Sequence, residues 1–249
     1  MRVGIVGAGP AGLTLAHALC FLHGKNRIDE IRVYDRSEAL NPAIGGGLQL
    51  SCGAATLARL GIDVASVASP LRGVRSRNVD GTELLELDVR QAMAEARASK
   101  LGDGDGAFGI MRESLQKLLA EQIPDDGTLQ LGRKVTSVRH AGGSGKATLC
   151  FDDGTEDTPD LVVGCDGISS VVKAGCFPNE PAPTYSGVKV TFAIAPPGTR
   201  PQGSESIFHQ WLGDGAYCLS ASCIVWQQLR TMSVFLLYPL ALTAARVRA

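Results

Sequence analysis

The sequence predicts an α/β fold: a parallel sheet in the first and larger part of the chain, then a smaller part built of strands. Apolar runs at 2–7 and 160–164 are short and end in glycine or in Cys-Asp-Gly, as in buried parallel strands that lead into a loop. A helical pattern separates the first run from another strand-like segment at 30–35. Beyond Pro178, proline-rich connectors surround isolated strand-like segments, so we place a boundary near 178.

The composition is that of a globular protein and excludes some classes of function. Of 249 residues, 45% are hydrophobic and 20% charged, and the net charge is -1. A sequence-independent nucleic-acid binder would carry a basic excess, so no nucleic-acid partner is expected. The first strand leaves no room for a signal peptide. The apolar stretch Thr231–Ala245 contains Pro239 and is shorter than the roughly 20 residues of a membrane span, so we expect a soluble, cytoplasmic chain without a transmembrane segment.

Seven cysteines are scattered along the chain without a C-x-x-C pair. Their number is odd, and most lie in apolar runs. This pattern predicts small buried hydrophobic residues in a reducing compartment, with neither a disulfide framework nor a metal site.

The N-terminal segments predict a βαβ unit with a right-handed crossover. "RVGIVG" (2–7) is the first strand, "AGLTLAHALCFLHG" (11–24) the helix with Gly24 as its C-cap, and "EIRVYDRS" (30–37) the second strand.

The remaining elements follow in order. A helix at 51–61 ends at Gly61, and a hairpin at about 71–107 turns at Asp80-Gly81. An amphipathic helix in 109–124 is stopped by Pro124, three or four short strands occupy 129–165, and "GVKVTFAIA" (187–195) is a strand.

Three glycines follow the first strand with the spacing of a dinucleotide-binding loop. Gly7 would allow a sharp turn, Gly9 the approach of a diphosphate to the backbone, and Gly12 close packing of the helix on the sheet. Asp35 closes the second strand 23 residues after Gly12, where a carboxylate can accept hydrogen bonds from a ribose. A tight strand–helix turn and a solvated acid would also explain these residues, but the complete unit favours a nucleotide site.

"GAGPAGL" (7–13) and "DLVVGCDGISSVVK" (160–173) together resemble FAD-dependent monooxygenases of the aromatic-hydroxylase type, which include salicylate and p-hydroxybenzoate hydroxylases. The resemblance implies a Rossmann-type FAD-binding domain with a β-meander at 1–178, from which the hairpin at 71–107 extends, and a partial sheet-based substrate domain with an atypical tail at 179–249. It also implies that NAD(P)H reduces FAD, that the reduced flavin binds O₂, and that a C4a-hydroperoxide hydroxylates or epoxidises a small aromatic or polycyclic substrate.

The resemblance also assigns residues to the cofactor. In that family the glycine loop and the Asp-Gly pair lie at the diphosphate, the acid–arginine pair at the ribose and adenine, a second glycine loop along the flavin, a helix-leading arginine at the cofactor, and a valine backbone at the adenine. Asp166 could equally be a helix N-cap, and Arg112 an exposed helix-start residue. The residues that match are Gly7, Ala8, Gly9, Pro10, Ala11, Gly12, Asp35, Arg36, Gly46, Gly47, Arg112, Val135, Asp166 and Gly167.

The family's later GDAAH motif has no match. "WLGDGAY" (211–217) contains Gly-Asp but resembles a strand. We therefore expect a truncated product or gene model that retains FAD weakly or not at all. No catalytic side chain is assigned, since His209, Tyr185 and Tyr217 fit core or strand-face roles better. The oligomeric state is not readable. Two alternatives stay open: an NAD(P)-dependent Rossmann dehydrogenase and a non-catalytic FAD-binding fragment.

Overall fold

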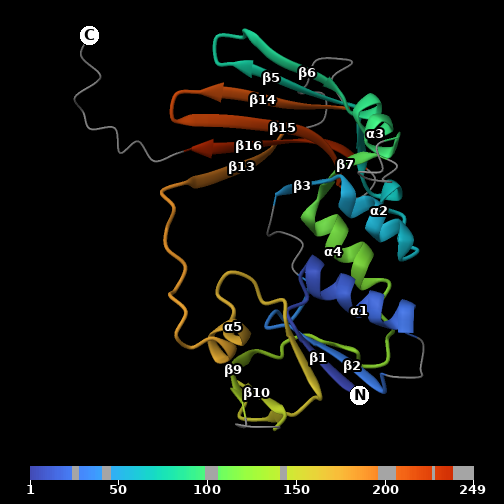
Figure 1. Ribbon diagram of the computed structural model, residues 1–249, viewed down its shortest axis with the longest axis vertical. Coiled ribbons are helices and arrows are strands. Elements are labelled where there is room, and N and C mark those ends of the chain that lie inside the picture. The colour runs from blue at the N-terminus through green and yellow to red at the C-terminus, as the bar shows by residue number, and fades with distance from the viewer. Residues whose placement is uncertain are drawn as a thin grey trace, which may run out of the picture. The chain divides into compact units, whose positions relative to one another are not determined.

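The chain divides into two compact units in a computed structural model, which describes residues 1–23, 28–40, 46–98, 106–140, 145–195, 206–225 and 228–237 (Figure 1). The first unit consists of Met1–Ile44, Leu60–Ile62 and Leu115–Pro183. The second unit consists of Gly45–Arg59, Asp63–Ser114 and Thr184–Ala249. The chain therefore enters the second unit well before residue 178. The functional names given to the two predicted domains stay predictions.

The first unit is built on a parallel sheet with the strand order β12–β1–β2–β8. The apolar run before the glycines forms β1, and the helix after them forms α1, as the sequence predicts. The helix α4 (Arg112–Ala120) begins in the second unit and continues in the first. The elements of the first unit are β1 (Arg2–Val6), α1 (Pro10–His23), β2 (Glu30–Tyr34), β8 (Leu129–Gln130), β9 (Val135–His140), β10 (Ala147–Phe151), β11 (Glu156–Asp157), β12 (Leu161–Gly164) and α5 (Val171–Cys176).

A small antiparallel sheet, β11–β10–β9, completes this unit, and its apolar face packs on the core. Side chains from both sheets and from α5 form one buried cluster: Val6, Tyr34, Val135, Val138, Leu149, Phe151 and Val172. Burial of this apolar surface is what holds the two sheets together. The helix of the βαβ unit packs on β1 and β2, with Leu13 and Ala16 fully buried. The proposed C-cap Gly24 lies outside the described residues.

The second unit is a mostly antiparallel sheet with the path β13–β16–β15–β14–β5–β6 (Figure 1). The predicted hairpin is β5 and β6, and Gly81 turns it with a φ of 90°. The elements of this unit are β3 (Gly47–Leu50), α2 (Cys52–Arg59), the 3₁₀ turn η2 (Val64–Ser66), β4 (Ser69–Leu71), β5 (Gly73–Asn78), β6 (Glu83–Asp88), α3 (Val89–Ala98), β7 (Ala107–Met111), β13 (Lys189–Ala195), β14 (Ile207–Gly213), β15 (Ala216–Val225) and β16 (Gln228–Leu237).

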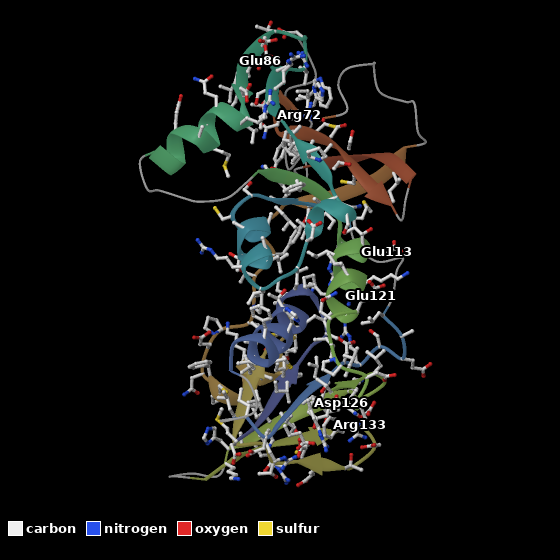
Figure 2. The ribbon with its side chains drawn as sticks, turned by 90° about the vertical axis from the view of Figure 1, so that its right-hand side faces the viewer. Arg72, Glu86, Glu113, Glu121, Asp126 and Arg133 are labelled. Atoms are coloured by element: carbon white, nitrogen blue, oxygen red, sulfur yellow. The ribbon has the colours of Figure 1, made fainter. Side chains whose placement is uncertain are left out.

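The strand β7 joins this sheet by pairing with β15, β3 and β4, and α3 packs against β5 and β6. The residues that form its core are Leu71, Val89, Ala107 and Ala221, with Val74, Met93 and Phe208 packed against them. At the hairpin, Arg75 is paired with Glu86, which Figure 2 labels on β6. The "WLGDGAY" stretch, predicted to be strand, contains the end of β14, a turn at Asp214 and Gly215, and the start of β15; Gly215 has a φ of 75°.

The prediction that the cysteines are small buried residues is wrong for most of them. Of the seven, Cys223 is buried, whereas Cys20, Cys52 and Cys176 are exposed and the other three are half-buried; all seven are free thiols. An apolar run misleads here because neighbouring positions of a helix or strand face opposite sides, so a cysteine beside buried residues can face solvent.

The segment after "LSASC" continues the sheet. Its strand β16 pairs with β15 from Gln228 onward and with β13 on its other side. The apolar stretch that begins at Thr231 is therefore strand up to Leu237, and its remainder lies outside the described residues. Among the described residues, no helix has both the length and the apolar character needed to cross a membrane.

Candidate functional site

The glycine loop of the first unit lies where three parallel strands end together. Val6 at the end of β1 pairs with Tyr34 on β2 and with Gly164 on β12. Because parallel strands end at the same edge, the segments 7–12, 35–37 and 165–167 follow side by side. This edge of an open α/β sheet is where such folds bind ligands.

Asp35 holds the loop through its backbone. Its Oδ2 accepts a hydrogen bond from the Ala8 N–H at 2.7 Å, and its Oδ1 accepts one from the Ser37 N–H at 2.8 Å. Each carboxylate oxygen keeps a further acceptor position. Asp35 can therefore order the loop and still accept a hydroxyl from a ligand.

Two of the glycines are required by close backbone contacts. A Cβ on Gly12 would lie 1.9 Å from the Gly7 carbonyl oxygen. A Cβ on Gly7 would lie 2.4 Å from the Cys165 carbonyl oxygen, and Gly7 also has a φ of 106°, which disfavours other residues. The first glycine motif and the Cys-Asp-Gly motif are thus in direct contact.

The carboxylate of Asp166 accepts hydrogen bonds from residues at the start of α5. Its Oδ2 accepts the N–H groups of Val171 at 2.7 Å and Val172 at 3.2 Å, and its Oδ1 accepts the Ser170 hydroxyl at 2.6 Å. Ser170, and not Asp166, is the N-cap residue, since its Oγ accepts the Lys173 N–H at 2.9 Å. Burial, and then the charge of Asp166, raises the pKa of the Cys165 thiol, which keeps this side chain neutral beside the loop.

The loop and the first turn of α1 present unused donors. The first bond of the helix runs from the Leu13 N–H to the Gly9 carbonyl at 3.0 Å. The N–H groups of Gly9, Ala11 and Gly12 donate to no acceptor within the described residues. Free amides at a helix N-terminus, together with the helix dipole, favour an anion.

Gln116 is a contact of the loop that sequence reasoning missed. Its Nε2 donates to the Ala8 carbonyl at 2.7 Å, from a position 108 residues along the chain. The sequence held no signal for this contact, because a glutamine on an amphipathic helix is an ordinary surface residue.

The flanks of this edge are formed by the predicted adenine-side residues. Val135 is buried in the core cluster beside Val6 and Val172, and Arg36 is exposed. Arg133, labelled in Figure 2, donates its N–H to the Asp35 carbonyl at 2.8 Å, and its guanidinium lies 4.1 Å from the centre of the Phe151 ring. This cation–π contact and the backbone bond fix the chain that follows Asp35.

The other predicted residues meet within the second unit. The Arg112 N–H donates to the Gly46 carbonyl at 3.1 Å, and Gly47 pairs with Met111 between β3 and β7. Two segments that lie far apart in the sequence and match separate family motifs are therefore adjacent.

A cavity of about 250 Å³ lies against this pair of strands. Its walls come from β3, β4, β7 and one face of the large sheet. Among the described residues that line it, none carries an ionised side chain: Gly47, Leu48, Gln49, Leu71, Gly109, Phe208, Leu219, Ala221 and Cys223. The cavity suits an apolar ring more than a charged group.

His209 belongs to the opposite face of the sheet. It follows Phe208 of the cavity wall, and neighbouring residues of a strand point to opposite faces. It is buried, stacks on Trp211 at 5.4 Å between ring centres, and its Nδ1 lies 3.4 Å from an Arg77 nitrogen. Tyr185 is exposed and Tyr217 half-buried.

Comparison with known proteins gives a consistent family. A family described as FAD binding domain matches residues 1–214. The chain is 31% identical over 227 residues to 3-amino-4-hydroxybenzoate 2-monooxygenase of Streptomyces cremeus, covering 87% of this chain and 52% of that protein. It is 28% identical over 242 residues to the salicylate hydroxylase asL1 of Sarocladium schorii, covering 87% of this chain and 47% of that protein.

The fold agrees with solved structures. Klebsiella pneumoniae HpxO complexed with FAD and uric acid superimposes with a TM-score of 0.74 at 20% identity, covering 96% of this chain and 56% of that one. The chain thus spans about half the length of the relatives it matches. With the glycine loop, the Asp-Gly motif and the matched family all in place, the chain belongs to the FAD binding domain family of FAD-dependent monooxygenases.

Proposed function

We propose that this chain forms the FAD-binding part, and some of the substrate-binding part, of a monooxygenase that uses NAD(P)H and O₂ to hydroxylate or epoxidise a small aromatic or polycyclic compound. Bound FAD supplies the redox and oxygen-activating chemistry of such an enzyme. We also propose that the chain acts in the cytoplasm.

The observation that carries the proposal is the backbone geometry of the glycine loop. The diphosphate of FAD fits there because Gly7 and Gly12 leave no space for side chains at the loop's internal contacts, while three amides point to no described acceptor. Asp35 lies at the end of β2 beside this loop, where the ribose of the cofactor would follow the diphosphate.

The remaining assignments extend along the cofactor. We propose that Arg36 and the Val135 backbone lie at the adenine, that Asp166 and Gly167 support the diphosphate through the start of α5, and that Gly46, Gly47 and Arg112 lie along the flavin. The contact between Gly46 and Arg112 supports a common role for these two segments.

The apolar cavity supports the substrate class. An uncharged wall that includes Phe208 would hold an aromatic ring by burial of apolar surface and by ring contacts. It lies against Gly47, the residue proposed to approach the flavin. The described residues that line it include no Asp, Glu, His, Lys, Arg or Tyr, so the contribution of this chain there is orientation and exclusion of water.

The experiment combines the purified chain with FAD, NADPH or NADH, and a panel of aromatic compounds under air. With FAD in excess, we expect weak substrate-dependent oxidation of the nicotinamide and products that gain one oxygen atom, with the label of ¹⁸O₂ in the product. Nicotinamide turnover that needs no oxygen and no flavin would favour a dehydrogenase instead. Flavin binding with no substrate-dependent turnover would indicate a non-catalytic FAD-binding fragment.

A further inference from the structure

The Ala8 peptide groups are held on both sides by side chains from distant parts of the first unit. The Ala8 N–H donates to Asp35 Oδ2 at 2.7 Å, and the Ala8 carbonyl accepts from Gln116 Nε2 at 2.7 Å. Ala8 is fully buried, so water cannot easily replace either partner. The sequence motif accounts for the first contact but not for the second.

The geometry of a peptide bond gives the Gln116 contact a consequence. The carbonyl of Ala8 and the N–H of Gly9 belong to one planar trans peptide and point in opposite directions. Fixing the carbonyl toward Gln116 therefore fixes the Gly9 N–H away from Gln116. That N–H is one of the amides without an acceptor among the described residues.

The same contact affects the first turn of the helix. In a regular helix that began one residue earlier, the Gly12 N–H would donate to the Ala8 carbonyl. Here Gln116 donates to that carbonyl and takes one of its two lone pairs, and the helix bonding begins with Leu13 and Gly9. The Gly12 N–H is left as a further donor for a ligand.

We infer that Gln116 is a positioning residue of the diphosphate site: by holding the Ala8 carbonyl, it aims the Gly9 amide at the anion and keeps the Gly12 amide available. The inference rests on the proposed FAD site and adds to it a residue that touches the loop, not the cofactor. The inference predicts that loss of Gln116 weakens the binding of a diphosphate-containing ligand and leaves the binding of the nucleoside alone unchanged.

The test compares ADP with adenosine as ligands of the full chain, by calorimetry, in Gln116→Leu and Gln116→Glu. Gln116→Leu removes the donor, and we expect about tenfold weaker ADP binding, as for a buried carbonyl left unpaired, with adenosine changed less than about twofold. Gln116→Glu keeps the side-chain length but cannot donate when ionised, and we expect at least the same loss for ADP. Gln122→Leu is the matched control, since Gln122 is exposed and its Nε2 donates to the nearby Leu118 carbonyl at 3.5 Å.

A spectroscopic measurement tests the same point at the amides themselves. In ¹⁵N-labelled wild-type chain, ADP should shift the amide signals of Gly9 and Gly12, and adenosine should not; Gln116→Glu should reduce the ADP-induced shifts. Three results would each overturn the inference. The variants could lose affinity equally for ADP and adenosine, their ADP affinity could be unchanged, or ADP could leave the Gly9 amide signal of the wild type unmoved. Absence of any ADP binding would reject the FAD site as well, whereas a diphosphate-specific loss without monooxygenase turnover would reject only the proposed activity.

Discussion

Gly12 is the residue at which the loop leaves least space. Replacing it with alanine would set a Cβ 1.9 Å from the Gly7 carbonyl oxygen, so the loop or the helix has to move. We expect Gly12→Ala to lower the free energy of unfolding by about 1–3 kcal/mol, typical of overpacking, and to weaken ADP binding. Urea unfolding and an ADP titration measure the two effects.

Gly106→Ala is the matched control for that substitution. Its added Cβ would lie 3.6 Å from Phe108 Cε2, an ordinary contact. The crowding argument fails if the two variants unfold at the same urea concentration.

Tyr34 joins the two sheets of the first unit through polar contacts inside the apolar cluster. It is 2% exposed, and its hydroxyl donates to Asp157 Oδ2 at 2.6 Å, while Asp157 Oδ1 accepts from Arg2 Nη2 at 2.5 Å. Burial, and then Asp157, raises the pKa of Tyr34 to about 12. Burial alone would raise the pKa of Asp157, but the hydrogen bonds from Tyr34 and Arg2 bring it below its ordinary value.

This raised pKa predicts a loss of stability at alkaline pH. Below the ordinary value of 10 the tyrosine is protonated in both states, and its full contribution is present. Between 10 and about 12 the unfolded chain loses the proton first, so stability falls as the pH rises. We expect the stability difference between wild type and Tyr34→Phe to shrink by about 1–2 kcal/mol from pH 8 to pH 11.

Urea unfolding at both pH values checks this, and Tyr185→Phe, at an exposed position, serves as the control. A difference between wild type and Tyr34→Phe that stays constant with pH would show that Tyr34 ionises alike in both states.

Residues whose role is local could be predicted, and residues whose role depends on distant contacts could not. Gly7, Gly12 and Asp35 follow one another within a single βαβ unit, so their spacing alone places them at one sheet edge. Gln116 reaches Ala8 from another helix, and only the folded chain brings the two together. The cysteines show the opposite error, since apolar neighbours in sequence do not decide which side a residue faces.

At the scale of elements, the short helix α5 depends on its cap. Ser170 Oγ accepts the Lys173 N–H at 2.9 Å and donates to Asp166 at 2.6 Å, so one hydroxyl connects the helix start to the Asp-Gly motif. We expect Ser170→Ala to lower the free energy of unfolding by about 1 kcal/mol, the usual cost of a lost N-cap. Ser169→Ala, at the exposed position just before the N-cap, should change the free energy of unfolding by less than about 0.5 kcal/mol. Chemical unfolding of both variants decides the point, and equal values would contradict the capping role.

Elements with strong local sequence signals could be predicted, whereas strands that depend on pairing with a distant neighbour could not. Asp80-Gly81 fixed the β5–β6 hairpin because the turn needs a positive φ, which Gly81 has at 90°. The strands β8 and β11 have two residues each and form because a neighbouring strand pairs with them. The range 129–165 therefore contains five described strands, β8 to β12, where the sequence predicted three or four. The strand β16 lies beyond residues 1–214, which the family matches in sequence, and its place follows from pairing with β13 and β15.

At the scale of the whole molecule, the residues proposed for the cofactor are divided between the two units. Those assigned to the adenosine diphosphate half, from the glycine loop to Asp166, belong to the first unit. Those assigned to the flavin half, Gly46, Gly47 and Arg112, belong to the second. All residues proposed for the adenosine diphosphate half thus belong to the first unit, and ADP is the ligand that tests them separately.

This division predicts how the chain binds the complete cofactor. The family resemblance implies that a GDAAH motif holds the flavin side of the cofactor, and this sequence does not contain that motif, so we expect FAD to bind little more tightly than ADP. We expect the affinities of FAD and ADP to agree within about tenfold, or 1.4 kcal/mol, and FAD to be lost on desalting. Calorimetry gives the two affinities, and absorbance near 450 nm reports retained flavin.

Two controls accompany this measurement. FMN, which lacks the adenosine part, should bind far more weakly than FAD or ADP. Gly12→Ala should weaken the binding of FAD and of ADP by the same factor, because both ligands use the glycine loop. A desalted protein that stays yellow with one FAD per chain would mean that Gly46, Gly47, Arg112 and their neighbours hold the flavin without the missing motif.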